Sequence, residues 1–119
     1  MIRYFNKKEK QIIEVEREAD AVWINLSPPF ASGDLEHFCE KFDFPLDFLT
    51  DSLDIDERSR YEKEDDIILV LINSPMINIQ NKEGEAIYIT VPIGIIIVKD
   101  LVITVCSRNN PIIDRFLEQ

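Results

Sequence analysis

The first 26 residues carry short apolar or alternating runs, which are typical of β-strands. Ile2–Phe5 is apolar, residues 6–10 form a polar turn, and Gln11–Arg17 alternates between apolar and polar positions over most of its length. Ala21–Leu26 is rich in aromatic and β-branched residues, and Ser27-Pro28-Pro29 ends it because proline cannot donate a ladder hydrogen bond. The pattern predicts three strands at the start of the chain.

The middle of the chain shows the spacing of amphipathic helices. We predict a first helix over Gly33–Phe42, with Ser32 as its N-cap. Its apolar stripe at i, i+3, i+4 and i+7 consists of Leu35, Phe38, Cys39 and Phe42. A second, shorter helix is predicted over Pro45–Leu53 with Pro45 at its first position, where proline is favoured.

The second predicted helix has an apolar side and an acidic side. The apolar side consists of Leu46, Leu49 and Leu53. At roughly 100° per residue, three aspartates lie together about 80–140° around the helix from Leu46. These are Asp47, Asp51 and Asp54, so the helix displays an acidic stripe beside its apolar face.

The second half of the chain returns to strand patterns. Ile67–Ile72 is a continuous apolar run, as expected of a strand that is covered on both faces. Ile77 and Ile79 then alternate with polar residues, and residues 81–84 (Asn-Lys-Glu-Gly) predict a turn.

A hairpin is predicted after this turn. Ile87–Val98 is a long β segment in which Pro92 and Gly94 predict a bulge or bend. Lys99-Asp100 joins it as a tight turn to a further strand, Leu101–Cys106.

Together these elements follow the order βββ-αα-βββ-α and predict a single domain over residues 1–119. Helices inserted among strands predict an α/β or α+β fold, in which helices pack on a sheet of mixed strand direction. The last helix opens at Asn109-Asn110-Pro111 and is barely complete at Gln119. This ending leads us to expect a piece truncated from a longer protein.

Charge and composition narrow the classes of partner. The 119 residues hold 23 acidic and 13 basic side chains, for a net charge of −10, with no visible basic face. Phosphate groups would repel such a chain, which argues against nucleic acids and anionic membrane surfaces. The hydrophobic content of 45% is typical of a globular protein.

The sequence lacks the marks of secretion and membrane insertion. No apolar signal core follows Met1, and the longest apolar stretch, Ile93–Val98, is far shorter than the roughly 20 residues of a membrane span. Cys39 and Cys106 have no CxxC partner, which predicts a reducing compartment and neither a disulfide framework nor a zinc knuckle. We expect a soluble chain.

No catalytic pattern stands out in the sequence. His37 and Cys39 are two positions apart on a helix and do not face each other, so we expect an exposed His37 and a core Cys39. The three glycines cannot form a nucleophile elbow or a phosphate-binding loop. Trp23 and the phenylalanines of the helices are expected in the core. We predict that the protein is not an enzyme.

The acidic segment between Asp47 and Asp66 is the one unusual feature. Its nine acidic and three basic side chains leave a local net charge of −6. One interpretation is a solvated face. Another is a site for a hard cation, because carboxylates suit Mg²⁺ and Ca²⁺, and Mg²⁺ needs only one or two protein carboxylates. The spacing of Asp51, Asp54 and Asp56 is wrong for an EF-hand.

Several segments, taken in order, resemble the N-terminal cytoplasmic domain of CorA-type magnesium and cobalt transporters. Trp23–Leu26 is similar to the family's strand that ends in Trp-Ile/Val-x-Ile/Leu. Phe42–Leu53 looks like its helix with Phe-Gly, His-Pro-Leu and Glu-Asp-x-Leu, and Arg58–Glu62 looks like its Arg-Pro-Lys-hydrophobic-Glu segment. The strand Ile67–Ile72 and the hairpin Gly94–Val105 complete the resemblance.

The resemblance spans about Trp23–Phe116 and departs from the family at three places. Asp43 replaces the usual glycine, Phe44-Pro45 replaces a His-Pro pair, and Ser59 stands where proline is common. The family is a homopentamer whose pore carries a Gly-Met-Asn signature, and this chain contains neither that tripeptide nor a span. The resemblance therefore implies only the sensing part of a transporter subunit, at the cytoplasmic face of the cell inner membrane.

The resemblance also implies a site. In the family, an aspartate at the position of Asp51 binds a regulatory divalent cation between subunits, with a partner aspartate from a stalk helix that is missing here. Together with the acidic stripe, this predicts Asp51, Asp47 and Asp54 as ligands for Mg²⁺ or Co²⁺, with very weak affinity in this fragment. The implied partners are divalent cations and other copies of the same subunit.

A hypothesis of another class stays open beside this one. The chain could be a free-standing acidic module that binds a basic protein partner through Asp47, Asp51 and Asp54, in which case salt should weaken the binding. An enzyme would need a carboxylate of raised pKa in a concave pocket.

Overall fold

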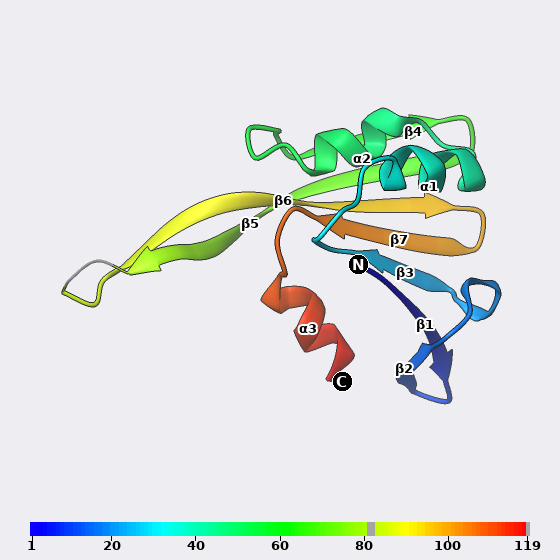
Figure 1. The fold of residues 1–119 in the computed structure, drawn as a ribbon, viewed down its shortest axis with the longest axis horizontal. Helices are drawn as coiled ribbons and strands as arrows, with labels where there is room; N and C mark the ends of the chain where they lie inside the picture. Colours follow the sequence, from blue (N-terminus) through cyan, green and yellow to red (C-terminus); the bar gives the residue numbers. More distant parts are fainter. Residues whose placement is uncertain (81–82, 119) are drawn as a thin grey trace.

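The fold is built on one sheet of seven strands. The computed structural model describes residues 1–80 and 83–118, and its strand order is β2-β1-β3-β7-β6-β5-β4 (Figure 1). The elements in chain order are β1 (Ile2–Lys8), β2 (Gln11–Val15), the 3₁₀ turn η1 (Glu18–Asp20), β3 (Trp23–Leu26), α1 (Asp34–Phe42), α2 (Leu46–Ser52), β4 (Arg60–Glu64), β5 (Ile67–Gln80), β6 (Ala86–Val98), β7 (Leu101–Cys106) and α3 (Pro111–Leu117).

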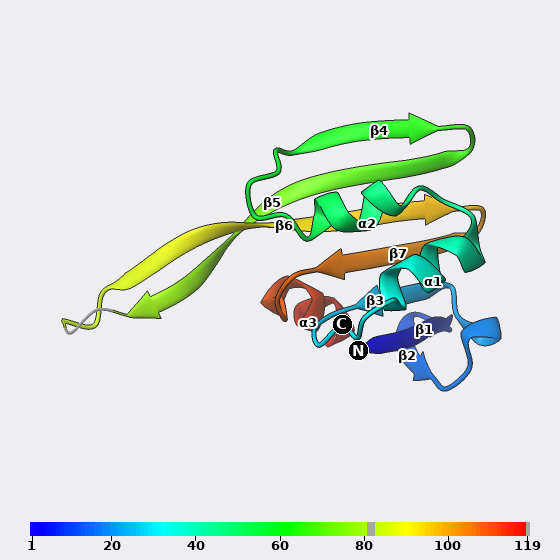
Figure 2. The same ribbon diagram turned by 45° about the horizontal axis from the view of Figure 1, so that its top comes forward.

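The predicted fold class is confirmed. β3 and β7 are parallel, while the other neighbouring strands are antiparallel, so the sheet is mixed. α1 and α2 lie together over one face of the sheet, and α3 lies on the opposite side (Figures 1 and 2). Helices therefore pack on a mixed sheet, as the alternation of helical and strand patterns predicts.

One strand is missing from the prediction. Arg60–Glu64 forms β4, an edge strand that pairs antiparallel with β5 from Arg60↔Leu71 to Glu64↔Ile67. Four of its five residues are charged, so it shows no apolar alternation along the chain. Charged side chains suit an edge strand because they oppose pairing with another sheet.

Several predicted boundaries shift. β1 continues to Lys8, so the turn after it contains only Glu9 and Lys10, and β2 ends at Val15. The prediction named a bulge or a bend at Pro92 and Gly94. The strand register runs unbroken through both residues, which excludes the bulge, and a register shift lies between Ile77 and Ile79 instead. The turn predicted at 81–84 falls partly outside the described residues, at 81 and 82.

α1 and α2 begin at other residues than predicted. Gly33, not Ser32, is the N-cap of α1, with φ of 85°, and the Asp34 carboxylate accepts a hydrogen bond from the Ala31 amide. Pro45 is the N-cap of α2 rather than its first helical residue, since its ψ of 137° is extended. The fixed φ of proline suits either position.

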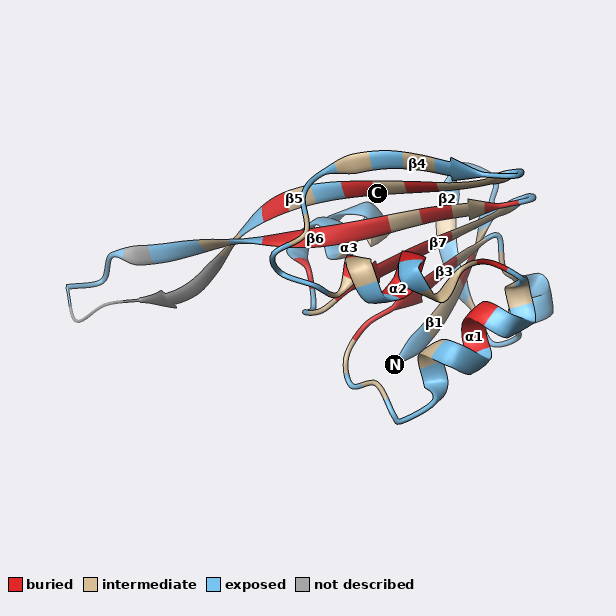
Figure 3. Ribbon diagram, turned by 90° about the horizontal axis from the view of Figure 1, so that it is seen from above, coloured by how far each residue is buried: buried red, intermediate tan, exposed pale blue. Residues whose placement is uncertain are grey.

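The main core fills the space between the two helices and one face of the sheet. Figure 3 shows buried residues along the central strands and on the helix sides that meet them. Phe48 and Leu49 of α2 are almost fully buried and form the centre of the helical contribution. The whole cluster contains Ile24, Leu26, Phe38, Cys39, Phe44, Phe48, Leu49, Leu69, Leu71, Ile96, Val98, Ile103 and Val105.

The opposite face of the sheet is only partly covered. A small cluster of Val91, Ile93 and Cys106 is buried there. Elsewhere on this face aliphatic side chains of β5 and β6 stay partly exposed, since they alternate with the core residues along each strand. They are Ile68, Val70, Ile72, Ile95 and Ile97. Ile72 is 47% exposed.

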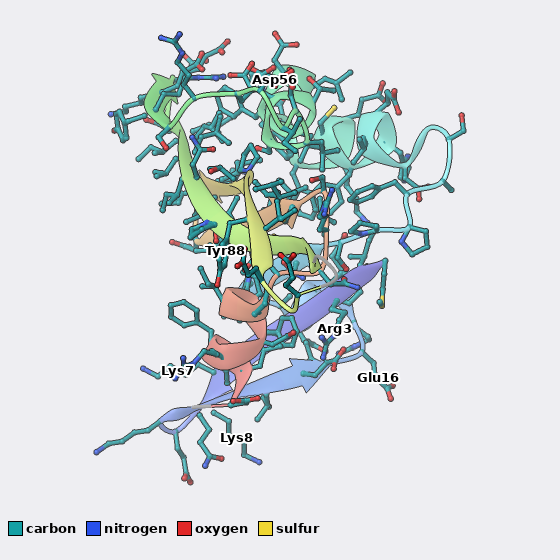
Figure 4. The ribbon with its side chains drawn as sticks, turned by 90° about the vertical axis from the view of Figure 1, so that its left-hand side faces the viewer. Arg3, Lys7, Lys8, Glu16, Asp56 and Tyr88 are labelled. Atoms are coloured by element: carbon teal, nitrogen blue, oxygen red, sulfur yellow. The ribbon has the colours of Figure 1, made fainter. Side chains whose placement is uncertain are left out.

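β5 and β6 extend past the rest of the sheet as a two-stranded ribbon (Figure 1). β4 pairs with β5 only as far as Leu71, and β7 pairs with β6 only as far as Ile93. Pro92 lies one residue beyond that last β6–β7 pair, where a missing amide donor costs least. Tyr88 projects from the ribbon and is 63% exposed (Figure 4).

α2 packs so closely on the sheet that only glycine fits beneath it. A Cβ atom on Gly94 would lie 2.6 Å from Ser52 Cβ and 2.9 Å from Val105 Cγ1, and would also collide with Ser52 Oγ. Ser52 is fully buried and its hydroxyl donates a 2.6 Å hydrogen bond to the Phe48 carbonyl. The missing side chain at Gly94 therefore sets how near α2 comes to β6.

We predict that Gly94→Ala lowers the free energy of unfolding by about 1–3 kcal/mol, because the added methyl group overpacks this contact. Urea denaturation measures the change. In a Ser52→Gly background the same substitution should cost less. An equal cost in both backgrounds would show that contact with Ser52 is not the cause.

Asp43 ends α1 in a left-handed conformation. Its φ of 56° and ψ of 58° lie where glycine is favoured. We predict that Asp43→Gly raises the free energy of unfolding by about 0.5–1 kcal/mol, since the left-handed strain disappears. Asp43→Ala is the matched control and should lower it. Equal stability of both variants would contradict the prediction.

Candidate functional site

The predicted ligands lie on α2 and just after it in the chain. Asp47 and Asp54 are exposed, and Asp51 is partly buried. Figure 4 shows Asp56 of the same acidic segment at the far end of the molecule from Lys7 and Lys8. The acidic segment, residues 47–66, therefore lies along α2, along β4 at the edge of the sheet opposite β2, and in the turns beside them; we call it the acidic edge.

Asp51 forms an ion pair with a basic residue of the neighbouring strand. Its Oδ2 accepts a 2.6 Å hydrogen bond from Nη2 of Arg60, the first residue of β4. Both side chains are about one-third exposed, at 32% for Asp51 and 31% for Arg60. This ion pair links the helix to the edge strand across nine positions of the chain.

Two further carboxylates surround the same guanidinium. Arg60 Nη1 lies 2.5 Å from Glu57 Oε2, and Arg60 Nε lies 3.4 Å from Glu62 Oε2. Three acids thus share one base, so this cluster of Asp51, Glu57, Arg60 and Glu62 keeps a net charge of −2. We call it the Arg60 cluster.

The electrostatics of the Arg60 cluster favour the charged guanidinium. The hydrogen bond to Asp51 raises the pKa of Arg60 most; burial opposes it, and the charges of Asp51 and Glu57 add to it. Because an arginine keeps its proton in proteins at any physiological pH, Arg60 is a permanent cation at this site.

The three predicted ligands do not come together. Asp54 Oδ1 accepts a 3.0 Å hydrogen bond from the Asp56 amide, which is a local turn contact, and Asp47 is exposed. Across residues 1–80 and 83–118, no group of three Asp, Glu, His or Cys side chains is arranged to hold a metal ion.

Asp51 alone still fits an open site. A hydrated Mg²⁺ needs only one or two protein carboxylates, so one aspartate could serve if water or another chain supplied the remaining ligands. Asp51 Oδ2 is however engaged by Arg60. Within this chain the residues therefore fit a partly hydrated cation that competes with an internal base, and they do not fit a closed site.

The pairing of Arg60 with Asp51 is not visible in the sequence. Arg60 is one of three bases in the acidic segment and lies in the Arg58–Glu62 resemblance, but its strand is absent from the prediction. Glu57 and Glu62, its nearest acidic neighbours along the chain, are a local signal, and only the fold shows that Asp51 joins them.

His37 and Cys39 lie as the helical spacing predicts. His37 is exposed, while Cys39 is buried and its thiol contacts the Glu36 carbonyl at 3.2 Å. Burial, together with nearby Glu40 and Glu36, raises the pKa of the Cys39 thiol. A thiol of raised pKa is a poor nucleophile.

An open cleft of about 860 Å³ lies beside the junction of α1 and α2. The turn between β4 and β5 and the turn between β6 and β7 also line it. Its lining includes Asp43, Glu64, Asp65, Asp66, Asp100, Lys41 and Lys99. The described residues that line it include no histidine, cysteine, serine or threonine. The lining therefore contains no Ser–His or Cys–His pair.

Comparison with protein families decides the relationship. A sequence model of the family described as CorA-like Mg2+ transporter protein matches residues 18–119, most of the chain. The chain belongs to the CorA-like transporter family. No curated protein sequence matches it. Among the described residues no helix is long and apolar enough to cross a bilayer.

Solved CorA structures share the fold. The complete structure of the CorA magnesium transporter from Methanocaldococcus jannaschii is 20% identical with a TM-score of 0.70; the match covers 99% of this chain and 36% of that chain. The soluble domain of CorA from the same organism is 21% identical with a TM-score of 0.69, and the match covers 99% and 45%. This CorA-like chain thus spans less than half the length of the structures it resembles.

The Arg60 cluster in this CorA-like chain predicts measurable coupling between helix and strand. In a double-mutant cycle of Asp51→Asn and Arg60→Gln, we expect a coupling energy of about 0.5–1 kcal/mol, as for a partly exposed ion pair in good geometry. Urea denaturation of the four proteins measures it. Asp51→Asn with Arg58→Gln is the matched control, since Arg58 is exposed, and should show no coupling. Coupling of equal size in both cycles would argue against a specific pair.

Proposed function

We propose that this chain is the cation-sensing, regulatory part of a CorA-like divalent cation transporter subunit, truncated from a longer membrane protein. The transported and regulatory cations are Mg²⁺ and, as a second metal, Co²⁺. The complete subunit assembles as a homopentamer, with this domain on the cytoplasmic face of the cell inner membrane. The chain has no catalytic role in this account.

The observation that carries the proposal is the family match over residues 18–119. The proposal also draws support from coverage, because this chain corresponds to 36% of a complete CorA transporter chain and 45% of a CorA soluble domain. The remaining length of such a subunit would have to contain the pore.

The partly covered sheet face supports a larger subunit. The continuous apolar run of β5 is typical of a strand covered on both faces, yet Ile68, Val70 and Ile97 of this face are only partly buried. Ile72 is 47% exposed on the same face. Further protein packed there would remove this apolar surface from water.

The acidic edge supports a regulatory role. Carboxylates that face each other across two subunits repel, and a divalent cation between them offsets that repulsion. A cation that binds the closed arrangement more tightly than the open one shifts the population toward closure. Asp51 is the residue through which we expect this chain to contribute, together with Asp47 and Asp54 on the same edge.

We predict that in the full-length protein Asp51→Asn raises the Mg²⁺ concentration that half-closes the transporter by about tenfold, because one carboxylate of a coupled site is lost. Transport assayed over a range of internal Mg²⁺ concentrations measures it. Glu40→Gln, an exposed acid on α1, is the control for the charge change and should leave the sensitivity unaltered.

Unchanged Mg²⁺ sensitivity in Asp51→Asn would remove Asp51 from the regulatory site. The reading frame after residue 119 provides an independent test, since we expect two apolar spans and a Gly-Met-Asn tripeptide. A stop codon there, with salt-sensitive binding to a basic protein, would favour a free-standing acidic interaction module instead.

A further inference from the structure

Arg60 is the only cationic side chain that the described residues place against the Asp51 carboxylate. Its Nη2 donates to Asp51 Oδ2 at 2.6 Å, whereas a Mg²⁺ ion would sit about 2.0–2.1 Å from a ligating oxygen. A guanidinium and a dication on the same small carboxylate repel each other strongly at that separation. While Arg60 holds Oδ2 that oxygen is not available to a cation, and a dication on the other oxygen would be repelled by the guanidinium.

We propose that Arg60 is a built-in competitor for the regulatory cation: it neutralises Asp51 when no metal is bound, and a divalent cation binds there only by displacing it. This rests on the proposed function, which places a divalent cation at Asp51. It adds a residue that sets the cation concentration at which the domain responds.

The Arg60 cluster makes the exchange feasible. When Arg60 leaves Asp51 it keeps Glu57 and Glu62, both within three positions of it in the chain. The guanidinium is therefore never left without a carboxylate. Because Arg60 cannot lose its proton, the exchange requires movement of the side chain rather than its titration. The residual charge of −2 of the cluster continues to attract a dication.

The exchange also has a structural consequence. Asp51 lies on α2 and Arg60 begins β4, so their ion pair ties the helix to the edge strand. The start of β4 stays attached to β5 by strand pairing and by a 3.1 Å hydrogen bond from the Asn73 amide to Ser59 Oγ. A cation at Asp51 therefore frees α2 from β4 without detaching β4 from the sheet.

A Mg²⁺ titration followed by amide and arginine-side-chain NMR tests the proposal on this chain. Sodium chloride keeps the ionic strength constant, so that screening does not imitate binding. The proteins are the wild type, Arg60→Gln, the matched charge control Arg58→Gln, and Asp51→Asn. We expect Arg60→Gln to lower the apparent dissociation constant for Mg²⁺ about fivefold to tenfold relative to Arg58→Gln.

The wild-type protein gives a second readout that needs no variant. As Mg²⁺ binds, the Arg60 Nε–H resonance should shift together with the Asp51 amide, whereas amide exchange in β4 should stay the same because β4 remains paired with β5. Asp51→Asn should abolish both changes.

The outcomes separate this proposal from the proposed function. If Mg²⁺ binds at Asp51 but Arg60→Gln binds it no more tightly than Arg58→Gln, and the Arg60 resonance stays still, Arg60 is not a competitor and the sensing role stands. If Asp51→Asn binds Mg²⁺ as the wild type does, the cation is elsewhere and both proposals fail. Absence of binding in Arg60→Gln would show that Arg60 is not what keeps the cation away, and would overturn the competition.

Discussion

The packing of α2 on the sheet is the contact that determines where the side chains of the acidic edge lie. Phe48 and Leu49 are buried beneath the helix, and Ser52 rests where Gly94 has no side chain. This close approach fixes the height and rotation of α2 over β6. The same rotation places Asp51 on the outer side of the helix, within reach of the first residue of β4. Packing in the core thus determines that Asp51 pairs with Arg60.

The Arg60 cluster shows how an acidic surface can be stable without a bound ion. Repulsion among three carboxylates is offset by one guanidinium, whose planar fork can serve several oxygens at once. The cost of this arrangement is that a carboxylate suited to a divalent cation is already engaged. Under the proposed sensing role, the response would depend on the difference in affinity of Asp51 for two cations, one of which is part of the chain. A single side chain, Arg60, would then set the threshold.

The two faces of the sheet differ in a way that suits a domain within a larger subunit. One face is closed by α1 and α2 over a continuous core, while the other carries aliphatic side chains that remain partly in water. The match to less than half of each solved CorA chain agrees with this asymmetry. The acidic edge and the open face are separate surfaces, so cation binding and packing against further protein need not compete.

Periodicity along the chain was enough for the helices, the apolar strands and the mixed α/β class, because each of these buries a face whose spacing is visible in the residues themselves. The order of segments also carried the family resemblance. Periodicity could not predict β4, because a charged edge strand is stabilised by its neighbour and shows no apolar alternation. It could not predict the partner of Asp51 either. Nine positions separate Asp51 and Arg60, and only the packing of α2 beside β4 brings them together. The spacing of apolar residues indicates which faces of a helix or strand are buried. Which charged side chains pair on the protein surface depends instead on how tertiary contacts position each element.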